Sequence, residues 1–404
     1  MTAVAPNQKW EFTARFRRHA FGWRSQPAIQ RIKQAVSEIR NAARRDPILG
    51  AEGAVVLLER VSAALENVDS SSGAIGTAVN SAIAQLVPIV ADAPADAKTR
   101  AKWLERLWAA YEADQIPYVE ELGDHWGELC ASKQVAAAWA DRLIDITRLA
   151  LSRDKSMRSF FCGTSACLSA LYRAERYQEI VDLVSGDEIW PYKRWAVKAL
   201  AALGKKSEAI RHAEASRGVW TSDIAVDRLC EEIVLSCGLT DEAYRRYGLR
   251  ANRAGTYLAT FRAVVRKYPH KPPREILHDL VQTTPGDEGK WFAAAKEEGL
   301  YDEALELAGA SPCDPRTLTR AARELATQRP DFAIGAGLLA LRWLANEFGY
   351  QVTGADVWAA YSSTITAAEH KGNVPEVRER IRQIIAVEAP GGLVTRALAK
   401  HVEG

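Results

Sequence analysis

A short pattern recurs three times in the second half of the chain and constrains the fold more than any other feature. Gly204, Gly238 and Gly299 are each followed, four and five residues later, by a Glu-Ala pair. Glycine readily adopts the left-handed backbone conformation that ends many helices, and a small alanine lets two helices approach closely. The pattern therefore predicts hairpins of two helices that turn at each glycine. A fainter copy without glycine spans residues 174–180.

The spacing of the pattern identifies the kind of repeat. Gly204 and Gly238 lie 34 residues apart, which is the tetratricopeptide period. Gly238 and Gly299 lie 61 residues apart, so one degenerate repeat fits at residues 257–284. The residues expected to cap the second helices are Ser207, Asp241 and Asp302. Residues from about 155 to about 350 thus resemble a tetratricopeptide-like right-handed α-solenoid.

The resemblance implies a non-catalytic scaffold for protein–protein interaction. A stack of hairpins presents a concave face, lined by the first helices of successive hairpins, on which a protein or peptide partner binds. No catalytic residue or cofactor is expected. The residues expected to line this face are Arg173, Lys193, Arg194, Lys198, Asp227, Arg228 and Glu231.

Helical periodicity extends beyond the repeats. Leu104, Leu107, Trp108 and Tyr111 follow the i, i+3, i+4, i+7 pattern of an apolar helix face, whereas no segment shows the strict alternation of a strand. The sequence therefore predicts an all-α fold. Breaks at residues 69–73 and 92–96 interrupt the pattern. The expected organisation is a basic helical domain at 1–95, connecting helices at 96–154, repeats at 155–350 and capping helices at 351–404.

The amino-terminal segment is strongly basic although the whole chain carries a net charge of only +2. Residues 1–45 contain ten basic and two acidic side chains, a local net charge of +8. Arginines provide phosphate contacts and exposed aromatic rings can stack on bases. The residues that would bind nucleic acid, or else an acidic protein partner, are Arg15, Arg17, Arg18, His19, Trp23 and Arg24. The alternative is structural: Trp10, Phe12 and Phe16 share one face and would form a core beneath solvated arginines.

A weaker hypothesis concerns a possible metal-dependent hydrolase. Asp124, His125 and Glu128 are close in sequence, with the last two one helical turn apart, which suits a metal pair or an acid/base pair. No further ligand stands at a recognisable spacing, so we expect a structural role and no metal. Phosphate-binding loops and nucleophile elbows are absent from the sequence.

The sequence also bears on the cellular compartment. The six cysteines form no C-x-x-C pair, and residues 1–9 lack the apolar core of a signal peptide. The most apolar stretch, Phe332–Leu341, is shorter than the roughly 20 residues that span a bilayer. We therefore expect a cytoplasmic protein with no membrane partner, of a composition consistent with a bacterial source, and expect residues 332–341 to form a buried helix.

Overall fold

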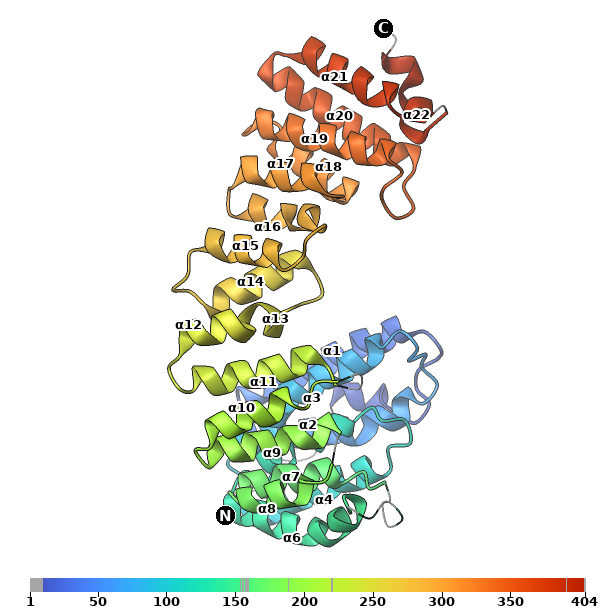
Figure 1. The fold of residues 1–404 in the computed structure, drawn as a ribbon. Coiled ribbons are helices and arrows are strands. Elements are labelled where there is room, and N and C mark those ends of the chain that lie inside the picture. The colour runs from blue at the N-terminus through green and yellow to red at the C-terminus, as the bar shows by residue number, and fades with distance from the viewer. Residues whose placement is uncertain are drawn as a thin grey trace. The chain divides into compact units, whose positions relative to one another are not determined.

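The computed structural model describes residues 10–152, 154, 156, 160–187, 189–218, 221–389 and 391–402. Regular structure in these residues is helical (Figure 1), and their one β-type contact is an isolated bridge between Gly218 and Thr221. The prediction of an all-α fold is therefore confirmed. The chain divides into two compact units, Met1–Leu229 and Cys230–Gly404.

The first unit holds the helices up to α10 and most of α11. Their bounds are η1 Glu11–Ala14, α1 Ser25–Ala43, α2 Pro47–Leu65, α3 Ala74–Asp92, α4 Ala97–Glu112, η2 Glu120–Leu122, α5 Trp126–Leu129, α6 Lys133–Ala150, α7 Thr164–Arg173, α8 Tyr177–Val184, α9 Trp190–Ala202, α10 Lys206–Glu214 and α11 Asp223–Leu235. Several of them begin at a residue whose side chain caps the first turn, such as Asp46, Asp96 and Ser132.

One hydrophobic core runs through the first unit from Trp10 to Ala199. The helices α1, α2 and α3 pack against one another, α2 packs on α4, and α6 packs on α7. The rings of Trp108, Trp126 and Trp139 meet at its centre, with centroids 5.0–5.4 Å apart. The core therefore continues across residues 95 and 154, where the sequence places domain boundaries, because helices on both sides of these points bury their apolar faces together.

The second unit holds the remaining helices. Their bounds are α12 Thr240–Ala243, the π-helix η3 Tyr244–Gly248, α13 Leu249–Ala251, α14 Tyr257–Lys267, α15 Pro273–Gln282, η4 Glu288–Trp291, α16 Phe292–Glu297, α17 Tyr301–Ala310, α18 Pro315–Leu325, α19 Pro330–Ala345, α20 Gly354–Lys371, α21 Val374–Ala386 and α22 Leu393–Val402. A second hydrophobic core extends from Tyr244 to Leu398.

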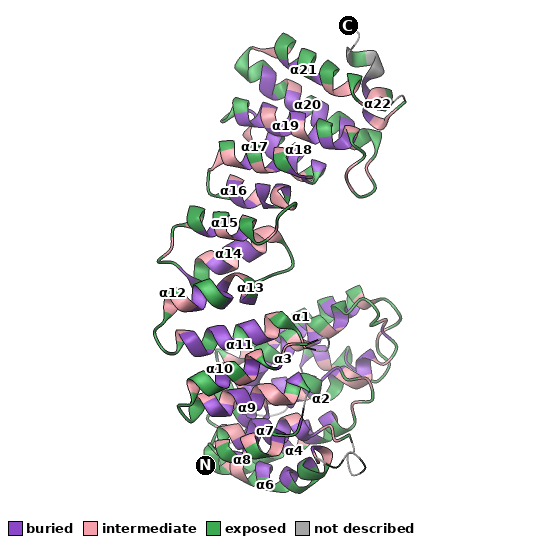
Figure 2. Cartoon of the chain, in the orientation of Figure 1, coloured by how far each residue is buried: buried purple, intermediate pink, exposed green. Residues whose placement is uncertain are grey.

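The helices of the second unit pack as successive pairs. α14 packs on α15, α16 on α17, α18 on α19 and α20 on α21, and each pair also contacts the next. The apolar stretch 332–341 lies in α19, where most residues are buried (Figure 2), so the expectation of a buried helix there is confirmed. Residues 257–284 form the hairpin of α14 and α15, in the position left for a degenerate repeat.

The predicted hairpin turns are present. Gly204, Gly238 and Gly299 have φ between +73° and +80°, and Glu175, in the faint copy, has φ +62°. After each of these residues the next N–H donates to the carbonyl oxygen five residues earlier, at 2.9–3.4 Å. This bond satisfies a carbonyl at the helix end, as in the Schellman motif. Gly372 makes the same closure between α20 and α21, which the sequence pattern did not indicate.

The predicted caps of the second helices are wrong. α10, α12 and α17 begin at Lys206, Thr240 and Tyr301, so Ser207, Asp241 and Asp302 lie inside the first turn rather than before it. The residues in the cap position are Lys205, Leu239 and Leu300, which form no side-chain cap bond. The turn is so short that the helix resumes directly after the glycine and one further residue.

One helix in the described part of the chain, α3, is long and apolar enough to cross a membrane by length and composition alone. In this structure α3 packs against α1 and α2 and buries Ile75, Ile83, Leu86 and Val90 in the core of the first unit.

Candidate functional site

The aromatic residues of the amino-terminal segment are core residues. Trp10, Phe12 and Phe16 are buried, and their rings form consecutive contacts with centroids 5.6 and 6.3 Å apart. The Trp10 ring also occupies the space beside Gly53 on α2, where a Cβ would overlap it. The prediction that these three rings share a buried face is confirmed.

The six residues predicted to bind nucleic acid or an acidic partner all lie at the surface: Arg15, Arg17, Arg18, His19, Trp23 and Arg24. Trp23 is 72% exposed. Two of them share one carboxylate, since Arg18 and His19 lie 3.6 and 3.1 Å from Glu66. Arg17 and Arg24 form no ion pair with any carboxylate that the structure describes. The structure therefore brings Arg18 and His19 together at Glu66, whereas Arg15 donates to Gln34 on α1 at 3.3 Å.

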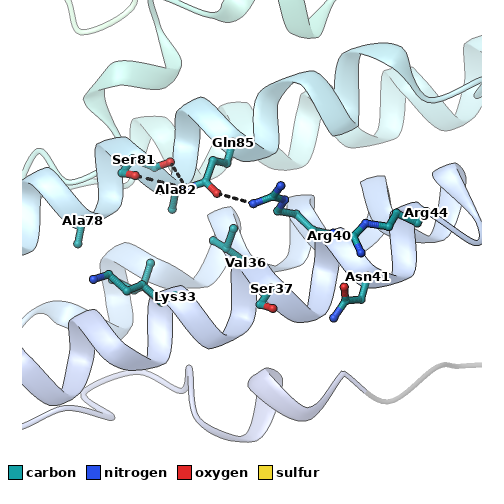
Figure 3. A pocket seen from close by; sticks show the side chains of 11 residues that line it. Lys33, Val36, Ser37, Arg40, Asn41, Arg44, Ala78, Ser81, Ala82 and Gln85 are labelled. Atoms are coloured by element: carbon teal, nitrogen blue, oxygen red, sulfur yellow. Dashed lines mark hydrogen bonds between the residues drawn. The ribbon is translucent and has the colours of Figure 1, made fainter. Parts of the chain in front are cut away.

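A groove beside this segment adds three further cations. Lys33, Arg40 and Arg44 on α1 line a groove of about 190 Å³ (Figure 3). The opposite wall is α3, whose Gln85 accepts a hydrogen bond from Arg40 at 3.2 Å. Gln85 is itself held by a bond to the carbonyl oxygen of Ser81 at 2.9 Å.

The groove between α1 and α3 has a positive charge that its walls do not neutralise. No Asp or Glu is among the residues that line it, and α3 has no charged residue before Asp92. The spacing of Lys33, Arg40 and Arg44 places the three on one helix face, a signal that was readable from the sequence. An anionic chain is the ligand that such a groove favours.

The seven residues predicted to line a concave face are placed differently from one another. Arg173 and Arg228 are exposed, whereas Lys193, Arg194 and Lys198 are half-buried. Arg173 donates to the carbonyl oxygen of Ala131 at 2.6 Å, and Arg194 pairs with Asp124. The Lys198 ammonium lies over the Trp195 ring, 4.6 Å from its centroid.

Asp227 and Glu231 do not lie on an exposed face, contrary to the prediction. Both are completely buried. Asp227 pairs with Arg217, and Glu231 accepts a bond from the Lys267 ammonium at 2.7 Å. The charged pattern along α11 had suggested a surface stripe, but these two carboxylates serve internal ion pairs because buried charges require partners.

Asp124, His125 and Glu128 do not form a metal site. His125 Nδ1 lies 3.1 Å from Glu128 Oε2, while Asp124 is turned to Arg194 on α9. Among the described residues, no group of three or more His, Cys, Asp or Glu side chains could hold a metal ion. The geometry supports structural contacts between α5, α7 and α9, which include the bond from Ser169 Oγ to the carbonyl oxygen of Asp124 at 2.8 Å.

A cavity of about 450 Å³ in the second unit was not anticipated from the sequence. It lies among η3, α13, α14, α15 and η4. Four arginines line it, at positions 245, 246, 250 and 253, together with aromatic, hydroxyl and apolar side chains. Arg-Arg followed by Arg at short intervals is visible in the sequence, but only the fold reveals that the four share a cavity. We refer to it as the arginine pocket.

A third cavity is an apolar groove of about 570 Å³ among α17, α19 and α21. Its apolar lining is provided by Leu305, Leu338, Leu339, Ile384 and Val387. Arg342 and Arg380 are also in the lining, and neither forms an ion pair with a described carboxylate. The one acidic lining residue, Glu388, accepts bonds from the backbone N–H groups of Val394 and Thr395 at 2.9 and 2.6 Å. Its charge therefore serves the start of α22.

No protein-family model matches this chain, and no curated protein compared with it is similar in sequence.

Proposed function

We propose that the chain is a non-catalytic helical-repeat protein, a right-handed tetratricopeptide-like solenoid that binds a protein partner. One observation carries this proposal: four hairpin turns have nearly the same backbone. The residues that follow the left-handed position, Arg176, Lys205, Leu239 and Leu300, have φ between −82° and −91° and ψ between 50° and 62°. This shared geometry, at turns that recur along the chain, supports the proposal that they are copies of one structural unit.

The packing between hairpins supports the same proposal. The first helix of a hairpin contacts the first helix of the next hairpin: α7 contacts α9, α14 contacts α16, and α18 contacts α20. The second helices contact one another in the same way: α17 contacts α19, and α19 contacts α21. The residue three positions into each second helix is completely buried: Ile180, Ala209, Ala243 and Ala304. Nearest-neighbour stacking of this kind is the basis of repeat-protein stability.

We place the partner helix in the groove among α17, α19 and α21, which is formed by second helices and not by the first helices that the sequence was expected to present on a concave face. Its apolar lining would accept residues spaced at i, i+3 or i+4, and i+7 along an amphipathic helix. Arg342 and Arg380 would meet acidic residues on the flanks of that helix, because complementary charge sets orientation and association rate. The partner we propose is therefore an acidic amphipathic helix of another protein.

The test is selection from a displayed library of random peptides on the full-length protein, followed by affinity measurement. Selected peptides should be acidic and amphipathic. Replacing Arg342 and Arg380 with Glu, or Leu339 and Ile384 with Arg, should weaken binding by roughly tenfold or more. The matched control reverses Arg320 and Arg323 on α18, two exposed charges outside the groove.

Two results would contradict the proposed partner. One is selection of peptides without helical apolar spacing or acidic residues. The other is equal loss of affinity in the groove variants and in the Arg320/Arg323 control, which would indicate a general effect of charge. Circular dichroism of each variant separates loss of binding from loss of folding.

A second candidate function is association with nucleic acid through the amino-terminal segment. The specific observation in its favour is the cationic groove between α1 and α3, which is lined by Lys33, Arg40 and Arg44 and by no Asp or Glu. Binding to RNA or DNA should weaken steeply with salt, because each neutralised phosphate releases counterions. Replacing Arg15, Arg17, Arg18 and Arg24 with Ala should abolish it, and unchanged affinity would refute this function.

A further inference from the structure

The arginine pocket brings several positive charges to the lining of one cavity. Of the fifteen residues that line it, four are arginines and none is Asp or Glu. An arginine stays protonated at every physiological pH and presents planar N–H donors that match the oxygens of phosphate. The volume of about 450 Å³ falls within the range of small-molecule pockets.

The neighbouring carboxylates lie outside the lining and are already paired. Glu242 accepts a bond from Arg246 at 3.0 Å and so offsets one of the four lining arginines. Asp287 accepts bonds from the Lys290 ammonium at 2.9 Å and from the Tyr257 hydroxyl at 2.7 Å. Both bonds lower the pKa of Asp287, and the bond from Lys290 has the larger effect. The ammonium of Lys290 therefore offsets the charge of Asp287.

The start of α14 adds to the positive potential of the pocket. α14 has eleven residues, and its cap residue Thr256 lies in the lining, with Oγ1 accepting from the N–H of Ala259 at 3.1 Å. The preceding loop is tied to the helix, because Thr260 Oγ1 accepts from the N–H of Ala254 at 2.9 Å. The positive end of the helix dipole and a fixed loop thus face the same cavity as the arginines.

Part of the pocket lining is apolar or aromatic, and we call this part the wall. Leu249, Leu280, Tyr257 and Trp291 line it. The rings of Tyr257 and Trp291 meet edge to face with centroids 4.7 Å apart, and Trp291 Nε1 donates to Thr284 Oγ1 at 2.8 Å. These contacts fix the wall in place. A ligand that has both a charged group and an apolar ring fits a lining that combines arginines with apolar and aromatic side chains.

The arginines reach the pocket from an irregular helix. The π-helix η3 inserts one extra residue per turn between α12 and α13, and such insertions often occur at functional sites. Gly248 at its end lies against the buried Tyr268 ring, with a hypothetical Cβ 2.9 Å from ring atoms. Beyond it, Asn252 donates to Glu231 at 2.6 Å and to the carbonyl oxygen of Gly248 at 2.7 Å. Buried contacts therefore hold the middle and the carboxyl end of the segment that carries the arginines.

We propose that the arginine pocket binds a small organic phosphate that has a flat ring, of the class of a nucleoside monophosphate. The arginines and the start of α14 would hold the phosphate, and the wall of Tyr257, Leu249 and Leu280 would hold the ring. The pocket shares no lining residue with the groove among α17, α19 and α21. This site and the proposed partner-binding function can therefore fail independently.

The experiment is calorimetric titration of the full-length protein with four probes. They are adenosine monophosphate, ribose 5-phosphate, inorganic phosphate and adenosine. We expect the nucleotide to bind most tightly, ribose 5-phosphate and phosphate more weakly, and adenosine not at all. Affinity for the nucleotide should rise between about pH 5 and pH 7, because the second pKa of a phosphate monoester is about 6 while arginine does not titrate there.

Variants assign the binding to the pocket. Replacing Arg245 and Arg253 with Ala should weaken nucleotide binding by roughly tenfold or more, and replacing both with Lys should weaken it less, because charge remains while the planar donor pair is lost. Replacing Arg320 and Arg323 with Ala is the matched control and should leave affinity unchanged. The proposal is overturned by absence of binding of all three phosphates, by equal binding of adenosine, or by unchanged affinity in the Arg245/Arg253 variants.

Discussion

The hydroxyl group of Tyr268 donates a buried hydrogen bond of 2.5 Å to Glu231 Oε1, which joins the end of α14 to α11. Lys267 and Asn252 bind the same carboxylate at 2.7 and 2.6 Å. Burial is the larger cause that raises the pKa of Tyr268, and the hydrogen bond to Glu231 is the second. The hydroxyl group therefore stays protonated and remains a donor. One carboxylate thus organises three partners beneath the arginine pocket.

Replacing Glu231 with Ala should lower the free energy of unfolding by about 3 kcal/mol, because it leaves a cation and two polar groups without their buried acceptor. Urea denaturation of the full chain measures this. The control is Glu232→Ala, the exposed neighbour on α11, which should change stability by less than about 0.5 kcal/mol. Equal effects of the two substitutions would contradict the role assigned to Glu231.

Two glycines should respond to alanine in opposite directions. A Cβ at Gly127 on α5 would overlap the backbone carbonyl oxygen of Ser169, and backbone cannot move aside easily, so Gly127→Ala should cost about 1–3 kcal/mol. Gly76 on α3 has no atom near its Cβ position, and Gly76→Ala should stabilise by up to about 1 kcal/mol through helix propensity. Thermal denaturation of both variants checks the pair, and a destabilising Gly76→Ala would show that the close approach at Gly127 is not the decisive difference.

The left-handed turn residues should also respond in opposite directions. Gly204 has open space around its Cβ position, so Gly204→Ala should cost about 1 kcal/mol through backbone strain alone. Glu175 already bears that strain, and Glu175→Gly should recover roughly 0.5–1 kcal/mol. The ion pair between Glu175 and Lys133 is exposed, and Glu175→Ala removes it while keeping the Cβ. If the Gly and Ala variants at 175 are equally stable, backbone strain at this turn is negligible.

The capping box of α20 should confer pH-dependent stability. Asp356 binds Arg316 at 2.7 Å and the N–H of Thr353 at 2.8 Å. The Arg316 bond is the main cause that lowers the pKa of Asp356 to about 2. Because this pKa is below the unfolded value of about 3.9, the contribution is complete above that value and is lost as the pH falls toward 2.

Asp356→Asn should therefore cost about 1–2 kcal/mol near pH 7, after allowance for solvent screening, and much less near pH 2. Urea denaturation at both pH values measures the difference. The control is Asp302→Asn, an exposed carboxylate for which the structure describes no ion pair. A cost at residue 356 that does not change with pH would refute the assigned linkage.

The sequence predicted the features that depend on local rules. The turn glycines, the buried alanine positions of the second helices and the breaks before α3 and α4 all follow from what the backbone permits at those residues. The placement of Trp10, Phe12 and Phe16 in a core followed from their shared face. These predictions did not require knowledge of which helices meet.

The features that depend on distant partners were not predictable. Asp227 and Glu231 belong to a charged stripe on α11, and only the positions of Arg217 and Lys267 show that this stripe is internal. The arginine pocket combines residues between 245 and 291 through a π-helix and a hairpin. No sequence pattern indicates the extra residue in the π-helical turn. The predicted caps were wrong because each second helix begins two residues earlier than the predicted caps require, directly after the turn.

Glutamate closes the turn at 175 with a left-handed φ like those of the glycines at 204, 238 and 299. The geometry of a hairpin can therefore persist after the sequence pattern that marks it has changed. A lineage of such chains could exchange its turn residues one by one, each at about 1 kcal/mol, while the helices continued to meet in the same way. Homology among proteins with this fold would then be easier to recognise from backbone angles than from a consensus sequence.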